Sequence, residues 1–396
     1  MLSHEKQHLT FNQQHDSYAW MSQRAWVEID LAALSYNVRQ LIKLLSPSTQ
    51  LMAVVKADAY GHGAIVVAQT ALESGASWLG VATVPEGIQL REAGIEAPIL
   101  ILGATHTPEQ IQAIAHWELQ PTLTSPKQAL VFSDTLEALD YNSPLPVHIK
   151  LDTGMSRLGT NWQEAGDFVQ LVQRLPHLAI KSVYSHLATA DSPDPAVMKQ
   201  QQQRFEQAIA KIRALGIEPP CLHLANSAAT LAEKSLHYDM VRAGLVIYGL
   251  YPAAHLNSSI DLKPVMQVKA RVTQVKTIAP GTGVSYGHHF IAPQEIRLAV
   301  VGIGYADGIP RNLSNKMQVL IRGQRVPQIG AITMDQLMLD VSAIPDVQEG
   351  EVVILLGKDG EEQISAEDWA NELNTISWEI LCSFKHRLPR VALGND

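Results

Sequence analysis

The stretch that decides the fold is VVKADAYGHG, which occupies residues 54–63. It completes an apolar run that begins at Leu51, and this run predicts a buried strand over Leu51–Ala57, followed by a glycine-rich turn into a helix. Lys56 lies at the end of that predicted strand, where a buried ammonium group either pairs with an anion or serves as a reactive amine. Desolvation makes a lysine amine more nucleophilic, so both an imine with a carbonyl compound and an ion pair fit this position.

Outward from this stretch, apolar runs alternate with segments that carry helix signals. Asp30 precedes an amphipathic stretch at Leu31–Leu45, and Ser125-Pro126 is one of several capping residues placed before a proline. Parallel strands need long crossovers, so strict alternation predicts an α/β fold with a (β/α)8 TIM-type barrel. An open doubly wound sheet is the alternative, and the absence of a glycine-rich dinucleotide turn after the first strand disfavours it. The seven further predicted strands are Trp78–Thr83, Pro98–Gly103, Gln120–Ser125, Pro146–Asp152, Ile180–Leu187, Cys221–Ser227 and Val241–Gly249.

The pattern changes after Pro264, where strands separated by short turns replace the alternation. We therefore predict three parts: a polar extension over residues 1–24, a barrel domain over 25–264, and a smaller, mostly β domain over 265–396. The strands predicted in the last part are Val265–Lys276, Arg297–Gly302, Met317–Ile321, Gln336–Val341 and Glu351–Leu356.

Charge and cysteine content exclude several classes of partner. The net charge of −9 is spread along the chain, which argues against nucleic acid or an anionic membrane as a partner. Cys221 and Cys382 are the two cysteines, too few and too far apart for a disulfide framework or a zinc site. With no zinc spacing among the cysteines, we expect no metal. The N-terminus lacks the apolar core of a signal peptide, so we expect a cytoplasmic protein.

Polar residues gather near the predicted strand ends. Because all strands of such a barrel end at one face, these side chains should converge on a single site. They are Lys150, Asp152 and Arg157 at the fifth strand, His186 at the sixth, and His223, Asn226 and Ser227 at the seventh. Arg242 lies near the start of the predicted eighth strand, with Tyr248 and Gly249 at its end.

These motifs resemble those of the alanine racemases, a two-domain branch of the barrel-type pyridoxal-phosphate enzymes. The resemblance runs from about Ala25 to the C-terminus. The matching strings are VVKADAYGHGA at 54–64, KLDTGMSRLG at 150–159, YSHLATAD at 184–191, HLANSAA at 223–229, VRAGLVIYGL at 241–250, VSYGHHF at 284–290, IGYADGIPR at 303–311 and GAITMDQLMLD at 330–340.

The resemblance implies an enzyme that interconverts L- and D-alanine with pyridoxal 5'-phosphate and so supplies D-alanine for peptidoglycan. Lys56 would hold the cofactor as an imine and exchange the α-proton on the D face of the substrate. Tyr286 would act on the L face from the partner subunit, which implies a head-to-tail homodimer with shared active sites. Two groups on opposite faces of one carbon are the minimum for a two-base mechanism.

The resemblance also assigns supporting roles. His186 would bind Tyr286 and tune it, with Arg242 and His223 behind, and Arg242 would face the pyridine nitrogen of the cofactor. Arg157 would meet the phenolic oxygen of the cofactor and the substrate carboxylate, which the Met334 backbone also binds. The cofactor phosphate would lie against Tyr60, Ser227, Gly244 and Leu245, with Asn226 and Asp335 in supporting positions. Lys150 aligns with a lysine that some members carry as a carbamate.

Three positions depart from the family pattern: His386 and Thr333 replace a common tyrosine and cysteine, and Trp378-Glu379 replaces a Tyr-Glu pair. They bear on the discrimination of alanine from serine, because one small group changes selectivity by only ~1–3 kcal/mol. Two alternatives remain at this point. One is a decarboxylase of basic amino acids, which needs an acidic pocket and a cysteine acid from the second domain. The other is a non-catalytic pyridoxal-phosphate carrier, which lacks that domain.

Overall fold

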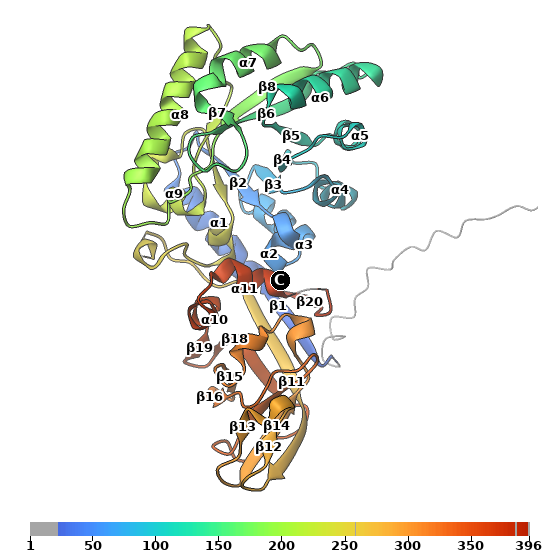
Figure 1. Ribbon diagram of the computed structural model, residues 1–396, viewed down its shortest axis with the longest axis vertical. Helices are drawn as coiled ribbons and strands as arrows, with labels where there is room; N and C mark the ends of the chain where they lie inside the picture. Colours follow the sequence, from blue (N-terminus) through green and yellow to red (C-terminus); the bar gives the residue numbers. More distant parts are fainter. Residues whose placement is uncertain (1–22, 258, 385, 395–396) are drawn as a thin grey trace, which may run out of the picture. The chain divides into compact units, whose positions relative to one another are not determined.

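The computed structural model describes residues 23–257, 259–384 and 386–394, so most of the predicted extension 1–24 lies outside the described residues. The described chain forms two compact units (Figure 1). The barrel unit comprises residues 29–266, 369–384 and 392–394, and the sheet unit comprises residues 23–28, 267–368 and 386–391. Both units take in short segments from the chain ends, which a division at residue 264 does not anticipate. Among the residues that the structure describes, no helix is long and apolar enough to cross a membrane.

The barrel unit confirms the predicted α/β barrel. Its described residues hold eight parallel strands in the order β10-β2-β3-β4-β5-β6-β8-β9. Backbone hydrogen bonds from Asp239 N to Leu222 O and from Arg242 N to Ala225 O join β9 to β10 and close the ring. The strands are β2 (Gln50–Val54), β3 (Trp78–Val81), β4 (Ile99–Ala104), β5 (Gln120–Leu123), β6 (Leu145–Asp152), β8 (Leu178–Tyr184), β9 (Leu222–His223) and β10 (Met240–Ala243), and the short β7 (Thr160–Asn161) pairs with β6.

Helices follow the strands and lie outside them (Figure 1). The predicted caps are present: Asp30 Oδ1 accepts from Ala33 N at the start of α1, and Ser125 Oγ accepts from Gln128 N at the start of α6. These side chains satisfy backbone N–H groups that a helix cannot pair internally. The helices are α1 (Leu31–Leu44), α2 (Lys56–Gly61), α3 (Ala64–Glu73), α4 (Val84–Glu92), α5 (Pro108–His116), α6 (Pro126–Ala138), α7 (Ala165–Gln173), α8 (Ala196–Ala214), α9 (Ser227–Ala232) and, from the C-terminal segment, α11 (Ser377–Ser383).

The predicted eighth strand, Val241–Gly249, is wrong in its second half. β10 ends at Ala243, and Leu245–Tyr248 forms a 3₁₀ turn in which all four residues are buried. An apolar run that is buried on every side has no periodicity to distinguish a strand from a turn. The break at Gly244 places Arg242, and not Tyr248, near the carboxyl end of the strand.

The sheet unit is mostly β, as predicted. Strand β11 is its longest and pairs with β14 and β18, and β1 follows β11 in the sheet order. The turn at Arg322-Gly323 has positive φ at both residues (51° and 69°), which suits a two-residue hairpin between β15 and β16. The elements are β1 (Ala25–Asp30), β11 (Met266–Ile278), β12 (Gly283–Val284), β13 (Phe290–Ile291), β14 (Ile296–Val301), β15 (Gln318–Ile321), β16 (Gln324–Pro327), β17 (Leu337–Asp340), β18 (Val352–Asp359), β19 (Glu362–Ile364), β20 (Arg390–Leu393) and the helix α10 (Ala366–Leu373).

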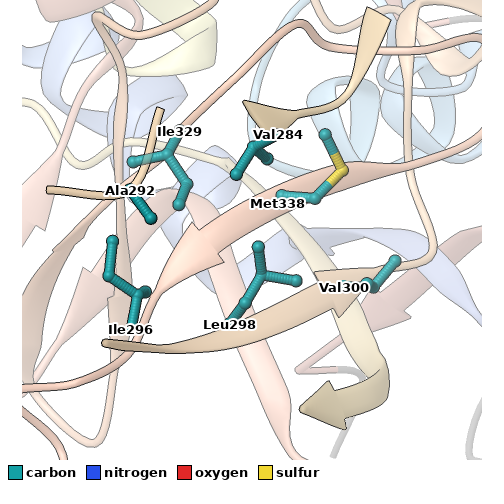
Figure 2. Close-up of a cluster of buried hydrophobic side chains, with 7 residues drawn as sticks. All are labelled: Val284, Ala292, Ile296, Leu298, Val300, Ile329 and Met338. Carbon is teal, nitrogen blue, oxygen red and sulfur yellow. The ribbon is translucent and has the colours of Figure 1, made fainter. Parts of the chain in front are cut away.

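A buried apolar cluster in the sheet unit supports the short β12–β13 ribbon (Figure 2). Val284 from β12 packs in this cluster beside Met338 from β17. Tyr286 lies two residues beyond Val284, so its backbone is anchored while its side chain remains exposed. The members of the cluster are Val284, Ala292, Ile296, Leu298, Val300, Ile329 and Met338.

Candidate functional site

A cavity of about 630 Å³ lies in the barrel unit, where the strands β2, β6, β8 and β10 end. It brings together most of the residues that the sequence singled out. Those that line it are Lys56, Tyr60, Lys150, Arg157, His186, Asn226, Ser227, Arg242, Gly244 and Leu245. His223 lies behind this wall, fully buried, and Tyr286, Met334 and Asp335 belong to the sheet unit.

Lys56 is followed by a left-handed helical turn, which the sequence analysis did not anticipate. Residues 57–60 all have φ between 52° and 54°. Left-handed backbone costs roughly 1–2 kcal/mol for each residue that has a Cβ, so surrounding contacts must hold the turn. Glu86 Oε1 accepts from Ala57 N at 2.8 Å, and Asp58 Oδ1 accepts from Ala64 N at 2.8 Å. The reversal carries the chain from Lys56 to Tyr60 while keeping both side chains on the cavity wall.

The cavity is rich in positive charge. Lys56, Lys150, Arg157 and Arg242 all line it, whereas Asp191 is the acidic side chain among its described lining residues. Burial, and secondarily the charge of Arg157, lowers the pKa of Lys56. Burial and the nearby cations, Arg242 first, lower the pKa of Lys150 to about 8. The site therefore favours an anionic ligand and holds amines with reduced proton affinity.

One end of the cavity presents hydroxyl and backbone groups. Gly244 N donates to Ser227 Oγ at 2.9 Å, and Ser227 begins α9. Tyr60 faces the same place, because a Cβ added at Gly244 would lie 2.7 Å from the Tyr60 hydroxyl. Only glycine leaves this space open. Such a group of hydroxyls beside closely approaching backbone suits phosphate oxygens.

Arg242 is 4% exposed and is held by neighbouring strands. Its Nη2 donates to the carbonyl oxygens of Ser185 and Leu224, at 2.8 and 3.0 Å. Its Nη1 donates to His223 Nδ1 at 3.0 Å, and Nη2 also donates to His186 Nδ1 at 3.2 Å. Burial lowers the pKa of Arg242 to about 10, which leaves the guanidinium charged at neutral pH.

Both histidines beside Arg242 are neutral at physiological pH. Burial, and then the charge of Arg242, lowers the pKa of His186 and of His223 well below the ordinary value. Arginine cannot accept a hydrogen bond, so each Nδ1 that faces it must be unprotonated. Each ring therefore carries its proton on Nε2.

The sheet unit presents its predicted residues on exposed loops. Tyr286 is 74% exposed and Met334 is 53% exposed, in contrast to the buried side chains of the cavity. Ser285 Oγ donates to Ala331 O at 2.8 Å, which links the loop of Tyr286 to the segment before Met334. Asp335 accepts from Arg387 Nη2 at 2.7 Å.

The positions that depart from the family pattern fall in different places. His386 is exposed, and Thr333 Oγ1 donates to Gln336 O within its own turn. Trp378, by contrast, lines the cavity together with Cys382, because α11 packs against α2 in the barrel unit. A Cβ at Gly61 would lie 2.6 Å from Leu381 O, which shows how closely the two segments approach. No local pattern in the sequence places this C-terminal helix at the site.

Two side chains that the sequence analysis grouped with the site have structural roles. The Tyr248 hydroxyl donates to Val54 O at 2.9 Å inside the barrel, and its ring stacks on His62. Asp152 Oδ1 accepts from Gly154 N and Ser156 N, so it shapes the loop that leads to Arg157. Tyr184, which the sequence analysis did not single out, lines the cavity and stacks on His223.

Comparisons with known proteins agree over nearly the whole chain. The family model described as alanine racemase, N-terminal domain, matches residues 29–252, and the corresponding C-terminal domain model matches residues 265–392. An alanine racemase of Nostoc sp. is 78% identical, covering 96% of this chain and 99% of the relative. One from Synechocystis sp. is 64% identical, covering 94% of this chain and 99% of the relative.

Solved structures give the same result. An alanine racemase of Clostridium difficile is 33% identical with a TM-score of 0.90, covering 94% of this chain and 97% of the other. The alanine racemase of Bacillus anthracis, solved with L-Ala-P bound, is 35% identical with a TM-score of 0.88, covering 94% and 96%.

Proposed function

This chain belongs to the alanine racemase family and is an amino-acid racemase, and we propose that it interconverts L- and D-alanine with pyridoxal 5'-phosphate held in the barrel cavity. The observation that carries the proposal is Lys56, a lysine of lowered pKa that follows the barrel strand β2, in a cavity lined by Arg157 and Arg242. The D-alanine formed would supply peptidoglycan synthesis.

The residues of the cavity fit the cofactor. Its phosphate is an anion, and the Tyr60 and Ser227 hydroxyls with the Gly244 and Leu245 backbone form a cradle that a Cβ at Gly244 would fill. Its aldehyde reacts with a neutral amine, and burial, which lowers the pKa of Lys56, favours that form. Once bound, pyridoxal phosphate withdraws electrons from the α-carbon of an amino acid and so makes its α-proton acidic.

Lys56 is the proposed base on the D face. Burial lowers the pKa of its Nζ, so the amine can take a proton from the α-carbon and return it. Arg242 is the proposed partner of the cofactor's ring nitrogen. Its guanidinium keeps its own proton and leaves that nitrogen unprotonated, which limits side reactions such as transamination.

Tyr286 of a second copy of the chain is the proposed base on the L face. Its 74% exposure, beside the exposed Met334, supports a surface that a second protomer covers in a head-to-tail homodimer. His186 has its Nδ1 occupied by Arg242, so its Nε2–H is free to stabilise the phenolate of that tyrosine. The Met334 backbone N–H would then bind the substrate carboxylate together with Arg157.

Lys150 is the proposed carbamate. It is 5% exposed and lies among Lys56, Arg157 and Arg242, three cations that repel its own charge. With a pKa of about 8, a usable fraction of its amine is neutral and can react with carbon dioxide, releasing one proton. The resulting anion would balance Arg157 and orient it.

The experiment that tests the function is incubation of the purified protein with L-alanine, L-serine and L-lysine separately. Chirality and carbon dioxide release are then measured for each. We expect racemisation of alanine, slower racemisation of serine, and no carbon dioxide from lysine. A decarboxylase of basic amino acids needs an acidic pocket, whereas Asp191 alone is acidic among the described lining residues of this cavity. Release of carbon dioxide from lysine without racemisation of alanine would overturn the proposal in favour of the decarboxylase. A carrier protein would change none of the three substrates.

A further inference from the structure

A chain of hydrogen bonds continues from Arg242 through the interior of the barrel, away from the cavity. His223 Nε2 contacts Ser182 Oγ at 2.8 Å, and Ser182 Oγ contacts His148 Nδ1 at 2.6 Å. His148 Nε2 contacts Gln120 Oε1 at 2.8 Å. These side chains come from β9, β8, β6 and β5, which are successive neighbours in the barrel. Ser182, His148 and His223 are 0% exposed, so water does not compete for these bonds.

The direction of every bond in this chain follows from Arg242. The guanidinium can only donate, so His223 Nδ1 accepts and the single proton of this ring lies on Nε2. That proton is donated to Ser182 Oγ, which leaves the serine hydroxyl to donate to His148 Nδ1. The proton of His148 then lies on Nε2 and is donated to Gln120 Oε1, an oxygen that only accepts. All donors point away from Arg242, with no unmatched group between the two ends.

Packing holds the two rings in the planes that these bonds require. Tyr184 stacks on His223 with ring centroids 4.6 Å apart and an interplanar angle of 4°. Trp78 meets His148 edge to face at 5.5 Å. Burial lowers the pKa of His148 to about 3, so this ring stays neutral with a single proton. With both rings neutral, the position of the single proton on each ring decides which of these hydrogen bonds can form.

We propose that Ser182, His148 and Gln120 are positioning residues for Arg242: their hydrogen bonds lock His223 in the tautomer whose Nδ1 accepts from the guanidinium. The opposite tautomer would direct an N–H at Arg242 and break that bond, which would remove the contact of Nη1 and loosen the orientation of the guanidinium on the cavity wall. This inference rests on the proposed function in one respect, namely that Arg242 faces the ring nitrogen of the cofactor.

The first test measures the tautomers directly by ¹⁵N NMR of the holoenzyme labelled at histidine. His148→Phe and His223→Phe identify the two rings by loss of their signals, and His237→Phe, which removes another buried histidine, controls for indirect changes. We expect both rings to be neutral at pH 7 with the proton on Nε2. A proton on Nδ1 of either ring, or a doubly protonated ring, would overturn the proposal.

The second test asks whether fixing the tautomer of His223 matters for the reaction. Ser182→Ala should mix the tautomers of His223 and lower kcat about tenfold in both directions, with KM for alanine little changed. Ser182→Thr, which keeps the hydroxyl, should restore most of kcat and the single tautomer. Ser133→Ala is the matched control, because it removes the hydroxyl of another buried serine, one that lies on the helix α6.

The possible outcomes distinguish a positioning role of Ser182 from a structural role, and both from a failure of the proposed function. Mixed tautomers with an unchanged kcat would show that the lock does not position Arg242. An equal loss of kcat and thermal stability in Ser182→Ala and Ser133→Ala would show a merely structural role, and would also overturn the proposal. A wild-type protein that stays colourless with pyridoxal phosphate would instead refute the proposed function, while the tautomers could still be determined.

Discussion

In the barrel unit, Arg242 is 4% exposed and donates to four acceptors, whereas in the sheet unit Tyr286 is 74% exposed with its ring on a loop. The first side chain is held by groups at the ends of β8 and β9, all within its own protomer. The second is anchored only through its backbone, beside the cluster of Val284 and Met338. The difference teaches that one half of the proposed chemistry is preorganised within a protomer and that the other half needs a covering surface.

The largest effect on racemisation is expected from a change in the barrel unit, at Lys56. Lys56→Ala removes both the proposed covalent anchor and the proposed base, so racemisation should fall by more than about 10³-fold. The near-ultraviolet and visible absorption of the covalently held cofactor should vanish with it. Absorption spectra and a coupled D-alanine assay measure the two effects. Lys199→Ala, at an exposed position on α8, is the control, and a coloured Lys56→Ala protein would remove Lys56 from the anchoring role.

Tyr286→Phe tests the exposed half. Loss of the phenol should slow α-proton exchange from L-alanine by about 10²–10⁴-fold while binding changes little, since the ring remains. Exchange in deuterated water, followed separately for each enantiomer, gives the measurement. Tyr141→Phe controls for the loss of a hydroxyl outside the site. If L-alanine exchanges as fast in the variant as in the wild type, a different group acts on that face.

A mixture of the two inactive variants tests whether the halves come from different chains. In a mixed dimer of Lys56→Ala and Tyr286→Phe, one site receives both intact residues if the site is shared. Random reassociation should then restore about a quarter of wild-type activity. Refolding the variants together and assaying the mixture measures this, with each variant refolded alone as the control. Without any recovery, the sites would not be shared between protomers.

A smaller effect concerns pH and the buried interior of the barrel. The pKa of His148 is about 3 in the folded protein and about 6.5 when unfolded. Between these values the unfolded chain binds one more proton, so this group makes stability fall as pH decreases, by about 1.4 kcal/mol per pH unit. His148→Phe removes two buried hydrogen bonds, so the variant should be less stable at pH 7. Because it also removes the titrating group, its free energy of unfolding should fall less steeply between pH 6.5 and 4.5. Urea unfolding at each pH measures the slope, and parallel slopes would show that His148 is not buried in its neutral form.

The smallest effect has an unusual sign. Ala57 has φ of 53°, a conformation that glycine adopts without strain, so Ala57→Gly should stabilise the protein by about 1 kcal/mol. The same change at Ala210, an exposed residue in the right-handed helix α8, should destabilise it by about 1 kcal/mol. Thermal unfolding of both variants gives the comparison. A loss of stability at both positions would mean that the left-handed turn carries no strain.

The sequence was sufficient to predict those features that repeat or lie close together along the chain. Alternation of strands and helices predicted the barrel, and Asp30 and Ser125 predicted two helix starts through their capping side chains. The period of two along β6 could also have shown that His148 shares a face with Lys150. The left-handed turn could not be predicted, because residues 57–60 contain no glycine and the turn depends on Glu86. The approach of α11 to Gly61 is equally hidden, since it joins residues far apart in sequence.

That approach has a consequence for synthesis on the ribosome. The wall of the cavity that carries Trp378 and Cys382 is the last helix before the final strand β20, and it packs on the turn that follows Lys56. A nascent chain that has already emerged as far as Met266 can close its ring of strands, but it still lacks this wall. Completion of the cavity must therefore wait until residues 377–383 have been synthesised, and truncation before Ser377 would leave a barrel with an open site.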